Sequence, residues 1–327
     1  MPANLPPDYY AAEERFRLAK TSEEKVRILE EMLSIMPKHK GTDHLKADLR
    51  SKISRLLKEG AKKKTGISTF NPYAVDREDC PQVVIIGPVN AGKSALVKYL
   101  TGAPTIVAEY PYATAMPSPG IFRHNHHRFQ LIDLPPVMGD VMEGWMGDFM
   151  RTSEGTIIVL DASSEKTLEA TDDLFKAIDS ANVFLTGLQD STPPLGTIPK
   201  KGIIALTKCD KADRDVVELL RSDFGKKFSI IETSVEGGVN KNQFAERLAQ
   251  TTGYIRVFTK IPGKKADIDE PYIIEKGTTV IELAEYVHRD LAEAFRFARV
   301  WGKNTFDGQR AGKEHILIDE DIVELHA

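Results

Sequence analysis

Cysteine, tryptophan and long apolar runs are scarce in this sequence of 327 residues. The two cysteines, Cys80 and Cys209, lie far apart and form no metal or redox motif, so we expect reduced thiols in a cytoplasmic protein. No apolar run approaches the roughly 18 residues that a membrane helix needs, and the first residues have no signal-peptide pattern. A disulfide scaffold and a membrane protein are therefore not expected.

A strong charge of one sign is also lacking, because the net charge is only −4 although 28% of the residues are charged. So small a global charge does not by itself predict a nucleic-acid partner. Between Lys38 and Gly66, however, ten basic residues occur with three acidic ones. Such a cluster attracts phosphate, but a solvated helix face with a flexible basic linker would have the same composition.

The length predicts about two domains, and residues 1–66 are expected to form an additional N-terminal helical region. Thr21 and Glu24 have the spacing of a capping box, and two apolar stripes follow it, separated by Pro37 and Gly41. The stripes consist of Val26, Leu29, Met32, Leu33 and Met36, and of Leu45, Leu49, Ile53 and Leu56. This pattern indicates a helical hairpin that packs against another domain or a protein partner.

Residues 80–252 alternate short apolar runs with helical patterns, which predicts an α/β domain with a doubly wound, mostly parallel sheet. The expected strands are Val83–Ile86, Phe129–Ile132, Thr156–Leu160, Gly202–Leu206 and Phe228–Ile231. Ligands of such sheets bind beyond the carboxyl ends of the strands. The chemical motifs of this sequence fall at those ends.

Residues 253–327 are expected to form a small α+β module. Tyr254–Thr259 and Tyr272–Glu275 have strand patterns, Thr279–Asp290 has a helical pattern, and short strands follow. Basic side chains and Trp301 would suit RNA phosphates and a stacked base, although basic residues on a small domain are more often only solvated. These basic residues are Lys260, Lys264, Lys265, Arg296, Arg299 and Lys303.

The segment Gly87–Ser94 has the spacing of a phosphate-binding loop, with an apolar strand before it and a helical stretch after it. Its glycines let backbone N–H groups of Asn90, Ala91 and Gly92 approach phosphate oxygens. Lys93 is expected to neutralise the β- and γ-phosphates, and Ser94 to supply a hydroxyl to Mg²⁺.

Two further residues are expected at the Mg²⁺ ion. Asp133 closes the strand Phe129–Ile132, where phosphate-loop enzymes have a carboxylate on the metal side. Thr114 lies in Tyr110–Pro119, interpreted as a switch loop, and its hydroxyl would join the metal only with the γ-phosphate present. Lys93 and Thr114 are the expected catalytic residues, acting by positioning and charge neutralisation because no general base is evident.

A guanine-specificity motif is expected at Thr207-Lys208-Cys209-Asp210, after the strand Gly202–Leu206. The Asp210 carboxylate accepts two hydrogen bonds from N1–H and the exocyclic amine of guanine, a donor pair that adenine lacks. The stem of Lys208 lies across the base, and the Thr207 hydroxyl bonds nearby backbone. After the next strand, Ser234 and Val235 follow, and the Val235 N–H is expected to face the guanine carbonyl.

In this order the motifs resemble the translation-factor-related GTPases, specifically the Obg group and its DRG (developmentally regulated GTP-binding) branch. The resemblance extends to a switch motif, to the segment before the GTPase domain and to a C-terminal TGS domain, a β-grasp module. These stretches are Pro111–Thr114, Pro37–Thr42, Arg256–Lys260, Val300–Gly302 and Asp319–Asp321. The resemblance implies GTP binding, Mg²⁺, slow hydrolysis and association with ribosomes or RNA. Asn90 matches the asparagine with which some relatives recruit K⁺.

The sequence departs from the family pattern in several ways. It has no room for the subdomain that DRG relatives insert in the GTPase domain, and Thr207 occupies the usual asparagine position. Pro136 replaces a glycine whose N–H binds the γ-phosphate, and proline has no N–H. Val137 has no group that orients water. We therefore expect slow hydrolysis or weak coupling of the switch to GTP, and the alternative is a guanine-nucleotide-responsive scaffold that hardly hydrolyses.

Two residue clusters have no assigned role in this scheme. Four methionines recur every fourth residue on one predicted helical stripe, at Met138, Met142, Met146 and Met150. Packing against the sheet is the preferred interpretation, and a face for a protein partner is the alternative. Three histidines cluster at a predicted strand turn, at His124, His126 and His127, and we interpret them as surface residues.

Overall fold

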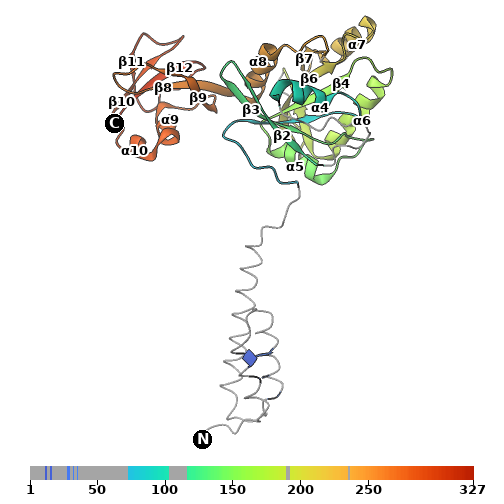
Figure 1. Cartoon of the computed structure of the whole chain (residues 1–327), viewed down its shortest axis with the longest axis horizontal. Coiled ribbons are helices and arrows are strands. Elements are labelled where there is room, and N and C mark those ends of the chain that lie inside the picture. Colours follow the sequence, from blue (N-terminus) through green and yellow to red (C-terminus); the bar gives the residue numbers. More distant parts are fainter. Residues whose placement is uncertain are drawn as a thin grey trace. The chain divides into compact units, whose positions relative to one another are not determined.

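The computed structural model describes residues 73–102, 116–188, 192–234 and 236–327, together with positions 12, 15, 16, 28, 29, 32 and 35. The chain divides into two compact units, Met1–Ala74 and Val75–Ala327 (Figure 1). In the first unit, Leu29 and Met32 of the first apolar stripe are helical and buried. The capping box and the remainder of the predicted hairpin lie outside the described residues.

A mostly parallel sheet with the order β2-β3-β1-β4-β6-β5 organises the first part of the second unit, and β7 pairs with β6. Only the pair β2–β3 is antiparallel. The predicted doubly wound sheet is confirmed, but β2 and β5 were not foreseen. The strands are β1 (Gln82–Ile86), β2 (Ser118–His124), β3 (His127–Asp133), β4 (Gly155–Asp161), β5 (Val183–Thr186), β6 (Ile198–Thr207) and β7 (Ser229–Glu232).

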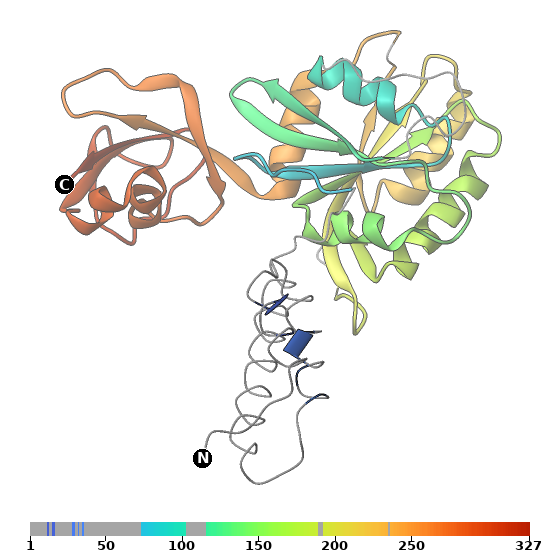
Figure 2. The same cartoon turned by 60° about the horizontal axis from the view of Figure 1, so that its bottom comes forward.

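Helices cover both faces of this sheet (Figure 2). Strand β1 is buried throughout, and its alternate side chains enter two different cores. One core contains α5 (Gly144–Thr152), α6 (Thr167–Ser180) and α7 (Arg214–Phe224), and the other contains α4 (Lys93–Thr101) and α8 (Lys241–Thr252). Burial on both faces explains the continuous apolar strand sequences.

A second, five-stranded sheet follows, with the order β11-β10-β12-β8-β9. Its β8 and β12 are parallel neighbours, and the other pairs are antiparallel. Gly253 ends α8 in a left-handed conformation and β8 begins at the next residue, so no linker separates the two sheets. The strands are β8 (Tyr254–Lys260), β9 (Asp267–Glu275), β10 (Phe297–Trp301), β11 (Gln309–Ala311) and β12 (Asp321–His326).

Two helices pack in this module where the sequence predicted one. Helix α9 (Val280–Val287) begins with a capping box between Thr279 and Glu282 and buries Leu283 in the core. The extended backbone of His288 then separates it from the short α10 (Arg289–Glu293). No helix in the described part of the chain is long and apolar enough to span a membrane.

Candidate functional site

The loop between β1 and α4 is shaped by two glycines. A Cβ atom on Gly87 would lie 2.3 Å from the carbonyl oxygen of Val159, so only glycine fits there. Gly92 is the N-cap of α4 with a φ of 88°, in the left-handed region that favours glycine. The helix therefore begins at Lys93, and the N–H groups of its first turn have no partner within the helix. This end of α4 suits an anion.

Lys93 is folded back over this loop. It is 6% exposed, and its Nζ donates to the carbonyl oxygens of Gly87 at 3.0 Å and Pro88 at 2.8 Å. Burial lowers the pKa of Lys93 to about 8, although the nearby Asp133 carboxylate opposes the shift. A buried ammonium bound only by carbonyl oxygens would gain strongly from a phosphate.

Ser94 and the buried Asp133 form a pair of oxygen donors beside Lys93. The Ser94 hydroxyl donates to Asp133 Oδ2 at 2.6 Å, and Asp133 is 1% exposed. Burial raises the pKa of Asp133, against the opposing effects of the Ser94 hydrogen bond and Lys93. Its Oδ1 is buried without a hydrogen-bond partner among the described residues. Hard oxygen donors with spare capacity fit Mg²⁺, which usually keeps water and phosphate ligands as well.

Thr207 and Lys208 join the end of β6 to the phosphate loop. The Thr207 hydroxyl donates to the carbonyl oxygen of Ala91 at 2.7 Å, and Lys208 Nζ donates to that of Asn90 at 3.1 Å. Lys208 also binds Asp161 at 2.6 Å. Burial would raise the pKa of Asp161, but hydrogen bonds from Lys208 and Ser163 outweigh it and the net shift is downward.

Asp161 was missed in the sequence analysis. It belongs to no local motif, and the only signal was a carboxylate that ends strand β4 at the ligand-binding edge of the sheet.

Asp210 is exposed on the loop after Lys208. The hydroxyl of Ser234 donates to its carboxylate and lowers the pKa of Asp210. Ser234 Oγ in turn accepts the N–H of Gly237 at 2.9 Å. The two segments predicted to contact guanine therefore meet through these side chains. Val235 and Thr114, predicted for the base and the metal, lie outside the described residues.

Comparison with known proteins agrees with this geometry. A family profile described as 50S ribosome-binding GTPase matches residues 82–189, and a TGS domain profile matches residues 255–327. An uncharacterized GTP-binding protein of Methanocaldococcus jannaschii is 25% identical over 370 residues, which cover 93% of this chain and 92% of that protein.

Two eukaryotic relatives align over the same extent. The developmentally-regulated GTP-binding protein 2 homolog of Dictyostelium discoideum is 23% identical over 92% of this chain and 98% of that protein. The ribosome-interacting GTPase 1 of Saccharomyces cerevisiae is 23% identical over 93% of this chain and 99% of that protein. The chain therefore has a GTPase domain followed by a C-terminal TGS domain, and over nearly its whole length it is similar to developmentally-regulated GTP-binding (DRG) proteins.

This chain lacks some residues of the Methanocaldococcus protein. The alignment with the Methanocaldococcus protein spans 370 residues, whereas this chain has 327. The Methanocaldococcus relative therefore carries residues without a counterpart here.

The segment after Asp133 contains Pro136, where the resemblance implied a glycine. The N–H of Leu134 donates to the carbonyl of Ile85 at 3.1 Å, and the N–H of Val137 donates to that of Gly87 at 3.2 Å. Pro135 and Pro136 have no N–H group. None of these four residues therefore has an amide free to bind a phosphate in this conformation.

The methionines after this segment pack mainly against the sheet. Met142, Met146 and Met150 are buried in the core with α6 and α7, whereas Met138 is 55% exposed. Helix α5 begins only at Gly144, so the predicted single helical stripe was wrong for Met138 and Met142. Their burial favours the core interpretation over a docking face.

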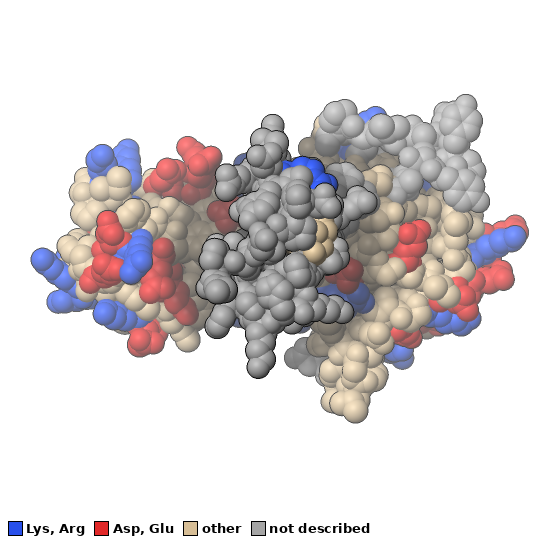
Figure 3. Space-filling view, turned by 90° about the horizontal axis from the view of Figure 1, so that it is seen from below, with Lys and Arg blue, Asp and Glu red and all other residues tan. Residues whose placement is uncertain are grey.

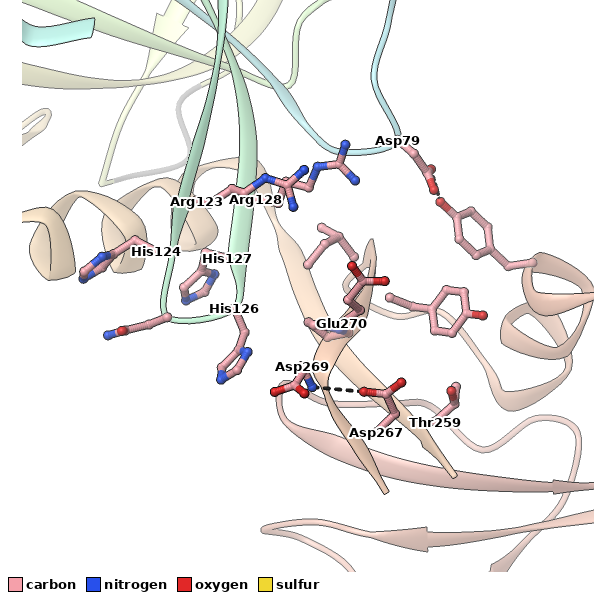
Figure 4. Close-up of a pocket in the computed structure, with 15 residues that line it drawn as sticks. Asp79, Arg123, His124, His126, His127, Arg128, Thr259, Asp267, Asp269 and Glu270 are labelled. Carbon is pink, nitrogen blue, oxygen red and sulfur yellow. Dashed lines mark hydrogen bonds between the residues drawn. The ribbon is translucent and has the colours of Figure 1, made fainter. Parts of the chain in front are cut away.

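The histidine cluster lies on the β2–β3 hairpin, beside a cleft of about 610 Å³ that reaches the TGS domain (Figure 4). Asn125 and His126 form the turn, both with positive φ. His127 is only 8% exposed, which corrects its interpretation as a surface residue. The opposite wall is acidic, with Asp267, Asp269 and Glu270 of β9.

Arg256 of β8 attaches the TGS domain to this hairpin. Its Nη1 donates to the carbonyl oxygen of Asn125 at 2.8 Å, while Nη2 binds Asp319 at 2.7 Å and Glu320 at 2.9 Å. The ring of His126 packs edge-on against Phe258. The acidic stretch that resembles other TGS domains therefore orients an arginine at the domain contact.

Several basic TGS residues have partners within the domain. Lys260 binds Glu324 at 2.8 Å and lies over the ring of Trp301, and Lys303 binds Glu320 at 2.7 Å. On the face in Figure 3, Lys and Arg side chains of the described residues lie among Asp and Glu side chains. Charge on that face gives little support for RNA binding.

Proposed function

We propose that this protein binds GTP and GDP with Mg²⁺ and acts as a molecular switch that hydrolyses GTP slowly. The observation that carries the proposal is the direct link between the two halves of the site. Thr207 and Lys208 of the guanine motif bind the carbonyl oxygens of Ala91 and Asn90 in the phosphate loop. These bonds would hold the phosphate loop and the guanine motif in fixed positions around one nucleotide.

The proposed roles follow from the chemistry of each group. Lys93 and the first-turn amides of α4 would bind phosphate oxygens, and Ser94, Thr114 and Asp133 would hold Mg²⁺. The bound Mg²⁺ supplies charge neutralisation at the phosphates. Asp210 would select guanine, oriented by Ser234, with the Val235 N–H at the guanine carbonyl. The side chain of Asn90 would help to bind K⁺.

Calorimetric titration with GDP and xanthosine diphosphate tests the assignment of Asp210. Xanthine has a carbonyl where guanine has its exocyclic amine, so an amide at position 210 can donate where the carboxylate accepts. Asp210→Asn is expected to weaken GDP binding and strengthen binding of xanthosine diphosphate. Unchanged preference for GDP would refute the guanine assignment, and tight competition by ATP in the wild type would refute GTP selectivity.

Slow turnover is proposed because the segment after Asp133 lacks a free amide. Loss of one charge-assisted hydrogen bond costs roughly 1.5–3 kcal/mol of γ-phosphate discrimination. Pro136→Gly restores an N–H and is expected to raise the ratio of GTP affinity to GDP affinity. Pro135→Gly, which adds the same flexibility and an N–H one residue earlier, tests whether the position of the restored amide matters. Equal ratios in Pro136→Gly and wild type would contradict this explanation.

A nucleotide-responsive scaffold that hardly hydrolyses GTP is the second candidate, favoured by the same two prolines. Single-turnover hydrolysis in K⁺ and in Na⁺, with and without ribosomes, distinguishes it from the slow GTPase. A ribosome or RNA partner is proposed from the name of the yeast relative and the matched profile. Co-sedimentation with ribosomal subunits in GDP and in GTP tests that partner.

A further inference from the structure

The turn between β10 and β11 presents a large aromatic side chain to solvent. Phe306 is 86% exposed, more than any other aromatic residue in the described part of the chain. Its backbone is fixed, because the Phe306 N–H donates to Gln309 Oε1 at 3.1 Å and its carbonyl accepts the N–H of Gln309 at 2.9 Å. Gly308, with a φ of 67°, completes the turn over the ring of Trp301. Phe306 is therefore held in an exposed position by its own turn.

An apolar groove adjoins this turn. A cavity of about 710 Å³ lies between the end of α8 and the TGS sheet, and most of its lining is apolar. Ile255, Leu317 and the 59% exposed Ile316 contribute to that lining. Lys303 and Asn304, at the start of the β10–β11 turn, form one rim. Exposed apolar surfaces of this kind usually mark an interaction site.

The charges at the groove and beside Phe306 are complementary. Among the charged residues that line the groove, Lys303 is neutralised by Glu320 and Asp319 by Arg256. The side chain of Lys276 makes no hydrogen bond or ion pair to any described residue, and neither does that of Asp307, which follows Phe306. The groove therefore offers an apolar lining with one uncompensated positive charge, and the turn offers an aromatic ring followed by a negative charge.

We infer that this protein forms a two-fold symmetric homodimer in which Phe306 of each copy enters the groove of the other, with Asp307 beside Lys276 of that copy. Phe306 does not fill the groove of its own chain, since it is exposed. The ring and the groove adjoin each other on one domain, so a single two-fold axis can fill both grooves at once. A buried aromatic side chain contributes much of the binding energy of a small interface, and the fixed turn reduces the entropy lost on association.

Sedimentation velocity of the full chain tests the dimer. Concentrations from about 1 µM to about 200 µM are needed, because an interface this small is expected to dissociate in the micromolar range. The sedimentation coefficient of the wild type should rise with concentration from the monomer value to the dimer value. Phe306→Ser and Ile316→Ser should each raise the dissociation constant by at least about tenfold.

Leu195→Ser is the matched control, because Leu195 is also largely exposed but belongs to the GTPase domain. It should associate like the wild type. All of these positions are exposed, so circular dichroism and melting curves of the variants should match those of the wild type. A wild type that stays monomeric throughout, or a Phe306→Ser variant that associates equally well, would overturn the inference.

Reversal of the two charges tests the proposed geometry. Lys276→Glu and Asp307→Lys should each weaken the dimer by about threefold to tenfold, because each places like charges together. The variant that carries both changes should associate like the wild type, since the pair is then reversed at both grooves. A double variant as weak as the product of the two single effects would overturn the proposed pairing.

Fluorescence of the apolar dye 1-anilinonaphthalene-8-sulfonate distinguishes a second copy from another occupant. Dye bound per chain should fall as the wild type dimerises, and should stay constant with concentration in Phe306→Ser. A monomeric wild type whose dye binding is lost in Ile316→Ser would show that the groove takes a different ligand, and would overturn the dimer. Phe306→Ser should bind GDP like the wild type, so failure of the dimer is separate from failure of the proposed function.

Discussion

At the scale of single residues, the buried ammonium of Lys93 is expected to make the proposed nucleotide binding sensitive to pH. Its pKa is about 8 because of burial, and a bound phosphate would raise it. Binding therefore takes up a proton once the pH exceeds about 8. We expect GDP affinity to fall roughly tenfold between pH 7 and pH 9, measured by calorimetry.

Buffers with different ionisation heats provide the control for this prediction. At pH 8.5 the observed binding enthalpy should change with the buffer in the direction of proton uptake. An affinity that stays constant between pH 7 and pH 9 would contradict the role given to Lys93.

Gly87 is constrained by a backbone neighbour rather than by its own conformation. An added Cβ would lie 2.3 Å from the carbonyl oxygen of Val159, so β1 or β4 must shift. Gly87→Ala should lower the free energy of unfolding by about 1–3 kcal/mol and weaken nucleotide binding. Gly144→Ala is the matched control, because nothing lies within 4 Å of that Cβ position. Equal urea midpoints for the two variants would refute the steric argument.

At the scale of elements, the β2–β3 hairpin buries a histidine that resists protonation. Burial, followed by the charge of Arg256, lowers the pKa of His127 to about 4. In the unfolded chain His127 takes up a proton near pH 6.5, but in the folded chain only near pH 4. The free energy of unfolding therefore decreases as the pH falls between those values. Its contribution should decrease by about 2 kcal/mol between pH 7 and pH 5.

Urea unfolding of wild type and His127→Gln at these two pH values isolates the contribution of His127 from that of the carboxyl groups. The wild type should lose more stability than the variant on acidification. Parallel losses would mean that His127 titrates normally in the folded protein.

The elements that the sequence predicted well are those with local signals. Short runs rich in β-branched, aromatic or other apolar residues predicted β1, β3, β4, β6 and β7, and the glycine spacing predicted the phosphate loop. Strand β2 begins Ser118-Pro119-Gly120 and has few apolar residues, so only its pairing with β3 defines it. Strand β5 has four residues and pairs with the first half of β6 alone.

The missed parts of the candidate site depend on contacts between distant segments. Asp161 belongs to the candidate site because it accepts a hydrogen bond from Lys208, which lies 47 positions away in the sequence. The N–H of Val137 is consumed by the carbonyl of Gly87, a backbone bond that no side-chain pattern encodes. His127 is buried near an arginine of the next domain, so its own sequence neighbours gave no sign of burial.

At the scale of the whole molecule, Arg256 makes a polar contact between the GTPase and TGS domains. Its side chain is 11% exposed and binds Asp319, Glu320 and the carbonyl of Asn125. Arg256→Met removes the bond to Asn125 and the ion pairs with Asp319 and Glu320, although Asp319 keeps the backbone N–H of residue 256 and Glu320 keeps Lys303. We expect a loss of about 1–3 kcal/mol and separate thermal transitions for the two domains, measured by scanning calorimetry.

Lys303→Met is the matched control for this prediction. It removes an exposed ion pair with the same Glu320, with side chains 72% and 43% exposed, and should change stability by less than about 1 kcal/mol. Removal of Arg256 should also raise the pKa of His127, which NMR titration of the imidazole would detect. Identical melting curves for the two variants would argue against Arg256 as a stabilising contact between the two domains.

Strand β3 runs from the contact with the TGS domain to the candidate nucleotide site. Asp133 at its carboxyl end is the candidate metal ligand, and His127 at its other end lies about 20 Å away beside Arg256. Ladders on both sides, to β1 and β2, stiffen it. Only Gly253 lies between α8 and β8, so the GTPase and TGS domains are joined without a flexible linker. A rotation of β3 at Asp133 would therefore also move its other end, which adjoins the Asn125 carbonyl that Arg256 binds.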